Sequence, residues 1–128
     1  MQRMLILAAV FGALGVAIGA FGAHGLEATL TANNRTDTFE TGTLYHLVHA
    51  VVLFGIAILV RDKRSPLLIY AGYAFVAGII FFSGSLYILA VFDLGFMGAI
   101  APLGGTAFII GWGLLGLVAL RDGDRIHL

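Results

Sequence analysis

Four long apolar stretches make up most of this chain of 128 residues, and none of them contains Lys, Arg, Asp or Glu. They cover residues 4–25, 42–60, 67–91 and 99–120. About 20 apolar residues are enough for a helix to cross a hydrocarbon core of roughly 30 Å, because each residue adds about 1.5 Å along the helix axis. We therefore predict an all-α membrane protein, a bundle of four transmembrane helices in a single domain, 1–128.

The composition agrees with this prediction and excludes several kinds of site. Hydrophobic residues make up 60% of the chain and charged residues 11%, whereas about 25% of a soluble domain is charged. The net charge of +0 gives no indication of nucleic-acid binding. Because the chain has no cysteine, it cannot form a disulfide, a thiolate nucleophile or a zinc–thiolate site.

The basic residues predict how the bundle is oriented. All but Arg35 lie on one side of the four-span layout: Arg3, Arg61, Lys63, Arg64, Arg121 and Arg125. Basic residues are enriched in the cytoplasmic parts of membrane proteins. We therefore predict that both termini and the turn at residues 61–66 are cytoplasmic, while residues 26–39 and the connection after Asp93 face outward.

The one long connection carries signals for local structure. The spacing of Leu26 and Leu30 predicts a short interfacial helix that ends at Asn33 and Asn34. Asp37, followed three residues later by Glu40, predicts an N-cap, so that the second long helix begins before it enters the lipid.

Small residues repeat at steps of four and three along the first span and recur in the fourth. Such residues let two helix backbones approach closely, which is a main source of helix association in lipid. The predicted packing positions are Gly12, Gly15, Gly19, Gly22, Gly104 and Gly105. We interpret them as packing within the bundle, with a dedicated oligomer interface as the alternative, and we expect a homo-oligomer.

Polar side chains gather in the outer halves of the spans. The candidate polar or ligand-binding cluster consists of His24, Tyr45, His46, His49, Ser83, Ser85 and Tyr87. The inner halves offer no ionisable group except Tyr70 and Tyr73, with Trp112 as a further aromatic residue. A proton or ion pathway needs groups at successive depths, so this one-sided polarity argues against a channel or pump.

The histidines can be interpreted in three ways. They can bridge helices by hydrogen bonds, which we favour because polar groups buried in lipid must find partners. His24, His46 and His49 can instead hold zinc or copper if the first two spans are adjacent, or His24 and His46 can ligate a haem. Ser83 with His46 could form a nucleophile and base, but no nucleophile elbow accompanies the pair. We expect no catalytic residue, metal or cofactor.

Five short segments resemble the signatures of a known family. They are GAFGAHG at residues 19–25, YHLVHA at 45–50, FSGSLY at 82–87, PLGG at 102–105 and GW at 111–112. The chain is identified by them as similar to the YgdD-like family of small membrane proteins, domain of unknown function 423, which the eukaryotic transmembrane protein 256 also resembles. The resemblance implies a four-helix, multi-pass protein of the bacterial inner membrane or its mitochondrial counterpart, without an established activity.

These observations together predict a non-enzymatic accessory or scaffolding role. The expected partners are the lipid bilayer and further copies of the chain or other membrane proteins, and no nucleic acid. The first alternative is a small-solute or ion transporter or channel that uses the polar cluster as its outer vestibule. The second is a metal- or haem-binding redox protein.

Overall fold

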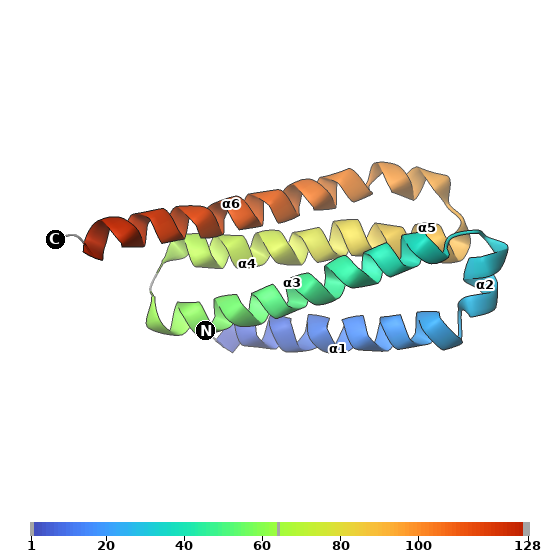
Figure 1. The fold of residues 1–128 in the computed structure, drawn as a ribbon, viewed down its shortest axis with the longest axis horizontal. Coiled ribbons are helices and arrows are strands. Elements are labelled where there is room, and N and C mark those ends of the chain that lie inside the picture. The colour runs from blue at the N-terminus through green and yellow to red at the C-terminus, as the bar shows by residue number, and fades with distance from the viewer. Residues whose placement is uncertain (1, 64, 127–128) are drawn as a thin grey trace.

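Four long helices run side by side in the computed structural model (Figure 1). It describes residues 2–63 and 65–126, with side chains up to residue 122, so that Arg64 and the side chain of Arg125 lie outside the described part. The elements are α1 (Gln2–His24), α2 (Glu27–Ala32), α3 (Thr36–Asp62), α4 (Pro66–Gly78), η1 (Ile79–Ser83), α5 (Gly84–Phe92), η2 (Gly95–Ala99) and α6 (Ala101–Ile126).

Within the described residues, four helices are long and apolar enough to cross a membrane. They are Gln2–His24, Thr36–Asp62, Pro66–Phe92 and Gly95–Asp122. The third consists of α4, the π-helical turn η1 and α5, and the fourth begins with the 3₁₀-helical η2. The predicted fold class, an all-α membrane protein with a four-helix bundle, is confirmed.

The helices pack as two pairs joined through α3. α1 lies along α3, α4 lies along α6, and α3 also contacts α4, η1 and α5 (Figure 1). Glycines set the close approaches: a Cβ atom on Gly15 would lie 2.7 Å from Cδ2 of Leu47 on α3. A Cβ atom on Gly104 would collide with the backbone of Phe82, so α6 touches the backbone of η1 there. These glycines therefore pack within the bundle.

Of the other predicted packing glycines, three have a neighbouring side chain within 4 Å of an added Cβ atom and one has none among the described residues. Gly19 and Gly22 face Thr43 and Phe39 of α3, and a Cβ atom on Gly105 would lie 3.8 Å from the ring of Phe82. Gly12 differs from the prediction, because a Cβ atom on it would meet nothing within 4 Å. Three residues before Gly15, it is rotated by about 60° around the helix, and it lines an open groove between α1 and α3 rather than a close contact.

The connection at the α2 end of the bundle follows the prediction in part. α2 forms where the short interfacial helix was predicted, and Asn34 takes the left-handed conformation with φ 53° that ends it. α3 begins at Thr36, ahead of the predicted span, but its N-cap residue is Arg35 rather than Asp37, and no side chain caps it. Asp37 lies in the first turn instead, where a carboxylate faces the positive end of the helix dipole.

The two ends of the bundle differ in charge. The end that holds both termini and the α3–α4 turn, here called the terminal end, carries Arg3, Arg61, Lys63 and Arg121 among its described side chains, with Asp62 and Asp122. The opposite α2 end carries Glu27, Asp37, Glu40 and Asp93 against a single basic residue, Arg35. One end is therefore mainly basic and the other mainly acidic.

Candidate functional site

His46 ties three helices together. Its side chain is buried, with Nε2 2.8 Å from the carbonyl oxygen of Phe11 on α1 and Nδ1 2.9 Å from the hydroxyl of Tyr87 on α5. A carbonyl oxygen only accepts, so Nε2 carries a proton, and in the neutral ring Nδ1 accepts from Tyr87. The ring reaches Phe11 because Gly15 has no side chain: a Cβ atom there would lie 3.3 Å from the His46 ring.

His49 has the opposite arrangement. Its Nδ1 lies 2.7 Å from the carbonyl oxygen of Tyr45, one turn earlier on the same helix, and therefore donates. Its Nε2 accepts a hydrogen bond of 3.2 Å from the indole Nε1–H of Trp112 on α6. Because an indole N–H can only donate, this bond requires a neutral His49 ring with its proton on Nδ1.

Aromatic side chains enclose His49. Its ring stacks on Phe108 of α6, with centroids 3.7 Å apart and ring planes 12° apart, and lies 5.4 Å from Phe75 of α4. Tyr45, four residues earlier on the same helix, stacks on His49 with ring centroids 6.0 Å apart. Gly111 makes room for this cluster, because a Cβ atom on it would lie 2.8 Å from Phe75.

The structure does not bring all the predicted polar residues to one place. His24 is exposed at the end of α1 and makes no side-chain hydrogen bond within the described residues. Ser85 bonds to the carbonyl of Phe82 in the preceding turn at 2.8 Å. Ser83 is fully buried in η1, and its hydroxyl has no protein partner in the described part of the chain. The predicted cluster is thus two separate networks around His46 and His49, with His24 apart from both.

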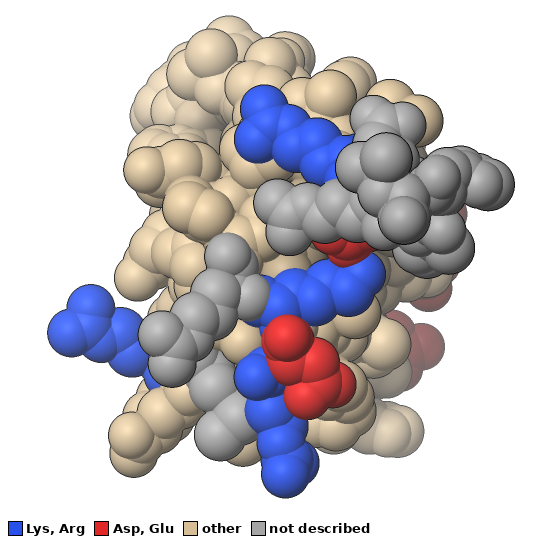
Figure 2. Space-filling view, turned by 90° about the vertical axis from the view of Figure 1, so that its left-hand side faces the viewer, with Lys and Arg blue, Asp and Glu red and all other residues tan. Residues whose placement is uncertain are grey.

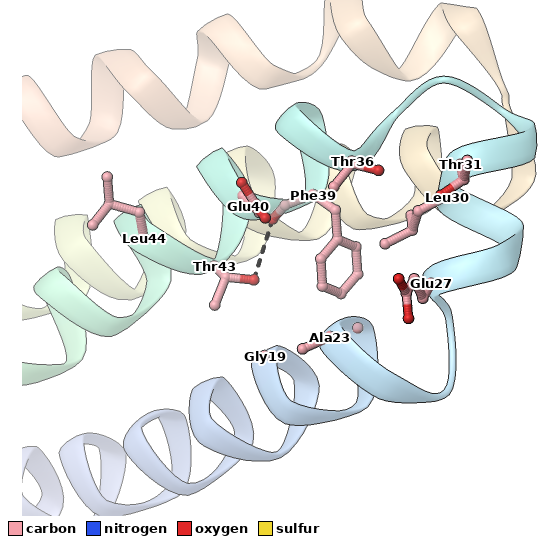
Figure 3. Close-up of a pocket in the computed structure, with 11 residues that line it drawn as sticks. Gly19, Ala23, Glu27, Leu30, Thr31, Thr36, Phe39, Glu40, Thr43 and Leu44 are labelled. Atoms are coloured by element: carbon pink, nitrogen blue, oxygen red, sulfur yellow. Dashed lines mark hydrogen bonds between the residues drawn. The ribbon is translucent and has the colours of Figure 1, made fainter.

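A cavity of about 550 Å³ opens at the α2 end, between α1, α2 and α3 (Figure 3). Phe39 projects from α3 toward α1 and rests over Gly22. The polar residues of the cavity wall are Glu27, Thr31, Thr36, Glu40 and Thr43. Such a lining offers acceptors and hydroxyl groups beside an aromatic ring.

A second group of contacts fastens the α2 end. The side-chain amide of Asn33 donates to the carbonyl oxygens of Ala90 and Val91 at 3.0 and 3.1 Å. Arg35 pairs with Asp93, 3.1 Å away, and Asp93 ends α5 in a left-handed conformation with φ 51°. Asp93 is thus an exposed C-cap residue, and it links α5 to the start of α3.

Sequence reasoning missed some of these residues for different reasons. The sequence identified Trp112 only as a further aromatic residue of the inner halves, although the tendency of an indole N–H to find an acceptor was a signal toward a histidine. The Phe11 carbonyl left no signal, because a backbone acceptor can belong to any residue type. Glu27, Thr31 and Thr36 lie in a connection whose folding back over α1 only the structure reveals.

Comparison with known proteins places the chain in a family. Residues 18–105 match the family described as a protein of unknown function, DUF423. The UPF0382 membrane protein YwdK of Bacillus subtilis is 45% identical over 123 residues, which cover 94% of this chain and 98% of the relative. The UPF0382 membrane protein SSP2132 of Staphylococcus saprophyticus is 42% identical over 115 residues, 90% of this chain and 94% of the relative.

The UPF0382 inner membrane protein YgdD of Escherichia coli K12 is 36% identical over 118 residues, which cover 92% of this chain and 89% of the relative. No solved structure matches the chain. None of these three names states an enzymatic activity. The prediction of a multi-pass inner-membrane protein is confirmed, and with it the resemblance first seen in the short motifs: the chain belongs to the DUF423 family of membrane proteins of unknown function.

Proposed function

We propose that this protein has a non-enzymatic accessory or scaffolding role in the membrane, and that its buried histidines hold the bundle together rather than a ligand. One observation carries the proposal: both ring nitrogens of His46 and of His49 already have hydrogen-bond partners in the protein. A metal or haem iron binds the lone pair of a neutral imidazole. At both histidines that lone pair accepts from Tyr87 or Trp112.

The same bonds argue against acid–base chemistry at His46. A base for Ser83 needs a free ring nitrogen within hydrogen-bond reach of the hydroxyl. His46 directs one nitrogen to Phe11 and the other to Tyr87, at 2.8 and 2.9 Å. Breaking either bond leaves a polar group unpaired in an apolar interior, which costs about 1–3 kcal/mol. The arrangement therefore favours helix bridging.

Cofactor content and histidine substitution test this proposal. We expect purified protein to contain no stoichiometric transition metal by elemental analysis and no Soret absorption. His46→Gln should keep most of the stability in detergent, because the amide can still donate and accept. Metal or haem in a fixed ratio, lost on His49→Gln but kept in His24→Gln, would overturn the proposal in favour of a redox role.

The cavity at the α2 end supports a second candidate, the binding or transport of a small solute. Its volume of about 550 Å³ is in the range of small-molecule sites, and the carboxylates of Glu27 and Glu40 favour a cation. Uptake measured in proteoliposomes tests this function: Glu40→Gln should reduce transport of an organic cation, with Asp37→Asn as the matched control outside the cavity. Equal uptake by protein-free liposomes would reject it.

We also propose that both termini and the α3–α4 turn face the cytoplasm. The distribution of basic residues supports this orientation, because the described Arg and Lys side chains gather at the terminal end and only Arg35 lies at the α2 end. Because the native chain lacks cysteine, Asn34→Cys should react with an impermeant thiol reagent added outside, whereas Lys63→Cys should react only after the membrane is opened. The reverse labelling pattern would contradict the orientation.

An accessory role implies association, and we propose that the protein forms homo-oligomers. Gly12, Gly113 and Gly116 are open to a further helix, because a Cβ atom on any of them would meet nothing within 4 Å in the described part of the chain. Native mass spectrometry in detergent tests this, with Gly113→Leu expected to reduce the oligomer and Gly104→Leu to disrupt the fold itself. A monomer in lipid nanodiscs at high protein density would reject self-association.

A further inference from the structure

A groove at the terminal end lies between the start of α1 and the first turns of α4. It has a volume of about 390 Å³ and is lined by Gln2, Arg3, Met4, Ile69 and Tyr73. Met4 is 1% exposed and packs tightly on α4, since a Cβ atom on Gly72 would lie 2.6 Å from its sulfur. This tight contact fixes the position of Gln2 and Arg3 relative to α4, so the groove belongs to the folded bundle.

The polar groups at the mouth of the groove provide hydrogen-bond donors and a positive charge. Arg3 is its only charged residue and forms no ion pair with any described residue, whereas Lys63 pairs with Asp122 and Arg35 with Asp93. Gln2 adds an amide donor beside it. A guanidinium group presents several N–H donors in a planar fork that suits the oxygens of a phosphate. The mouth of the groove therefore fits an anion.

The surroundings and the wall of the groove indicate what that anion is attached to. Figure 2 shows basic side chains spread over the terminal end, where Arg61, Lys63 and Arg121 outnumber the described acidic residues, Asp62 and Asp122. Below Arg3 the wall is formed by Met4, Ile69 and the half-exposed ring of Tyr73. A free phosphate ion would gain nothing from this apolar wall, but an acyl chain would.

We propose that this groove binds an anionic phospholipid, with its phosphate at Arg3 and Gln2 and one acyl chain along Ile69 and Tyr73. The position agrees with the chemistry, because tyrosine rings favour the boundary between headgroups and hydrocarbon. Basic pockets between transmembrane helices are known to hold anionic headgroups. The lipid would rest against both α1 and α4, which meet at Met4 and Gly72.

Titration of dioleoyl-phosphatidylglycerol into the full-length protein in phosphatidylcholine nanodiscs tests the proposal. We expect bound phosphatidylglycerol by native mass spectrometry and a rise of the melting temperature that phosphatidylcholine does not give. Arg3→Gln should weaken this binding roughly five- to tenfold, as expected for loss of one charged contact at a membrane surface. Arg3→Lys keeps the charge but not the planar fork of donors, so its affinity for phosphatidylglycerol should lie between those of the unchanged protein and Arg3→Gln.

Arg61→Gln is the matched control, since Arg61 is an exposed arginine at the same end and does not line the groove. It should bind like the unchanged protein; an equal loss in both variants would mean general charge attraction and overturn the proposal. Displacement of the lipid by millimolar inorganic phosphate would also overturn it, because it would remove the role of the acyl chain. If Arg3→Gln fails to fold, Arg3→Lys and Gln2→Leu provide the same comparison with Arg61→Gln.

Discussion

The networks around His46 and His49 both connect α3 to other helices, but they do so with different kinds of contact. His46 is held by hydrogen bonds to two other helices, α1 and α5. His49 bonds to its own helix and to Trp112, and most of its contacts with other helices are aromatic. Two histidines three residues apart on one helix therefore contact different halves of the bundle: His46 binds α1 and α5 by hydrogen bonds, and His49 contacts α4 and α6 mainly through aromatic rings.

The largest effect is expected where the His46 network depends on a glycine. Gly15→Leu should destabilise the bundle by about 3 kcal/mol, because its side chain would collide with Leu47 and push the His46 ring from the Phe11 carbonyl. Reversible unfolding in mixed micelles measures the change. Gly55→Leu is the control, since a Cβ atom at Gly55 would have no neighbour within 4 Å among the described residues and Gly55 is not part of the proposed oligomer surface. Equal losses of stability in the two variants would mean that the close approach at Gly15 does not itself stabilise the His46 network.

Loss of the His46–Tyr87 bond should have the next largest effect. Tyr87→Phe leaves the His46 lone pair unpaired between three helices, so we expect a loss of about 1–2 kcal/mol, the upper range for hydrogen bonds between membrane helices. The double variant with His46→Leu should cost less than the sum of the two single changes, because both remove the same bond. Strict additivity would mean that the bond does not contribute.

Trp112→Phe should have a smaller effect. The bond to His49 is longer, 3.2 Å, and Trp112 is 50% exposed, so we expect a loss near the average of about 0.6 kcal/mol for such bonds. Phe108→Ala in the same network should cost more, since it removes the ring on which His49 stacks. If Trp112→Phe proves more costly than Phe108→Ala, the His49 network is polar rather than aromatic in its main contribution.

The protonation of the two rings is a difference that can be measured without changing stability. Both histidines should be neutral in lipid with opposite tautomers, His46 protonated at Nε2 and His49 at Nδ1. Nitrogen-15 NMR of the labelled imidazoles distinguishes the two forms, and His46→Gln and His49→Gln assign the signals. The same tautomer at both positions would contradict the hydrogen bonds on which the comparison rests.

The architecture could be predicted from the sequence because each membrane span is visible as a long apolar stretch. An apolar stretch as long as residues 4–25, without a single charged side chain, is typical of a helix surrounded by lipid. The break at Asn33 and Asn34 follows from turn chemistry. The tyrosine stacked on His49 was also within reach, because a spacing of four residues on one helix fixes which side chains meet.

The site was harder to predict because its contacts join helices whose rotation the sequence leaves open. Nothing in the order of residues 19–25 places His24 outside the bundle while His46 points inward. The π-helical turn at 79–83 shifts the register of α5 against α4, so that Ser83 and Ser85 could not be placed from an ideal helix. The partner of His46 on α1, a backbone carbonyl, has no residue type that a pattern could detect.

The unequal charge of the two ends makes the inserted protein an electric dipole across the membrane. In an energised cell the interior is electrically negative, and moving one elementary charge through the full potential is worth about 2.3 kcal/mol per 100 mV. In the orientation proposed above, with the basic terminal end in the cytoplasm, the potential attracts the basic end inward and the acidic α2 end outward. The membrane potential would then stabilise this orientation of the bundle, and loss of the potential would remove that contribution.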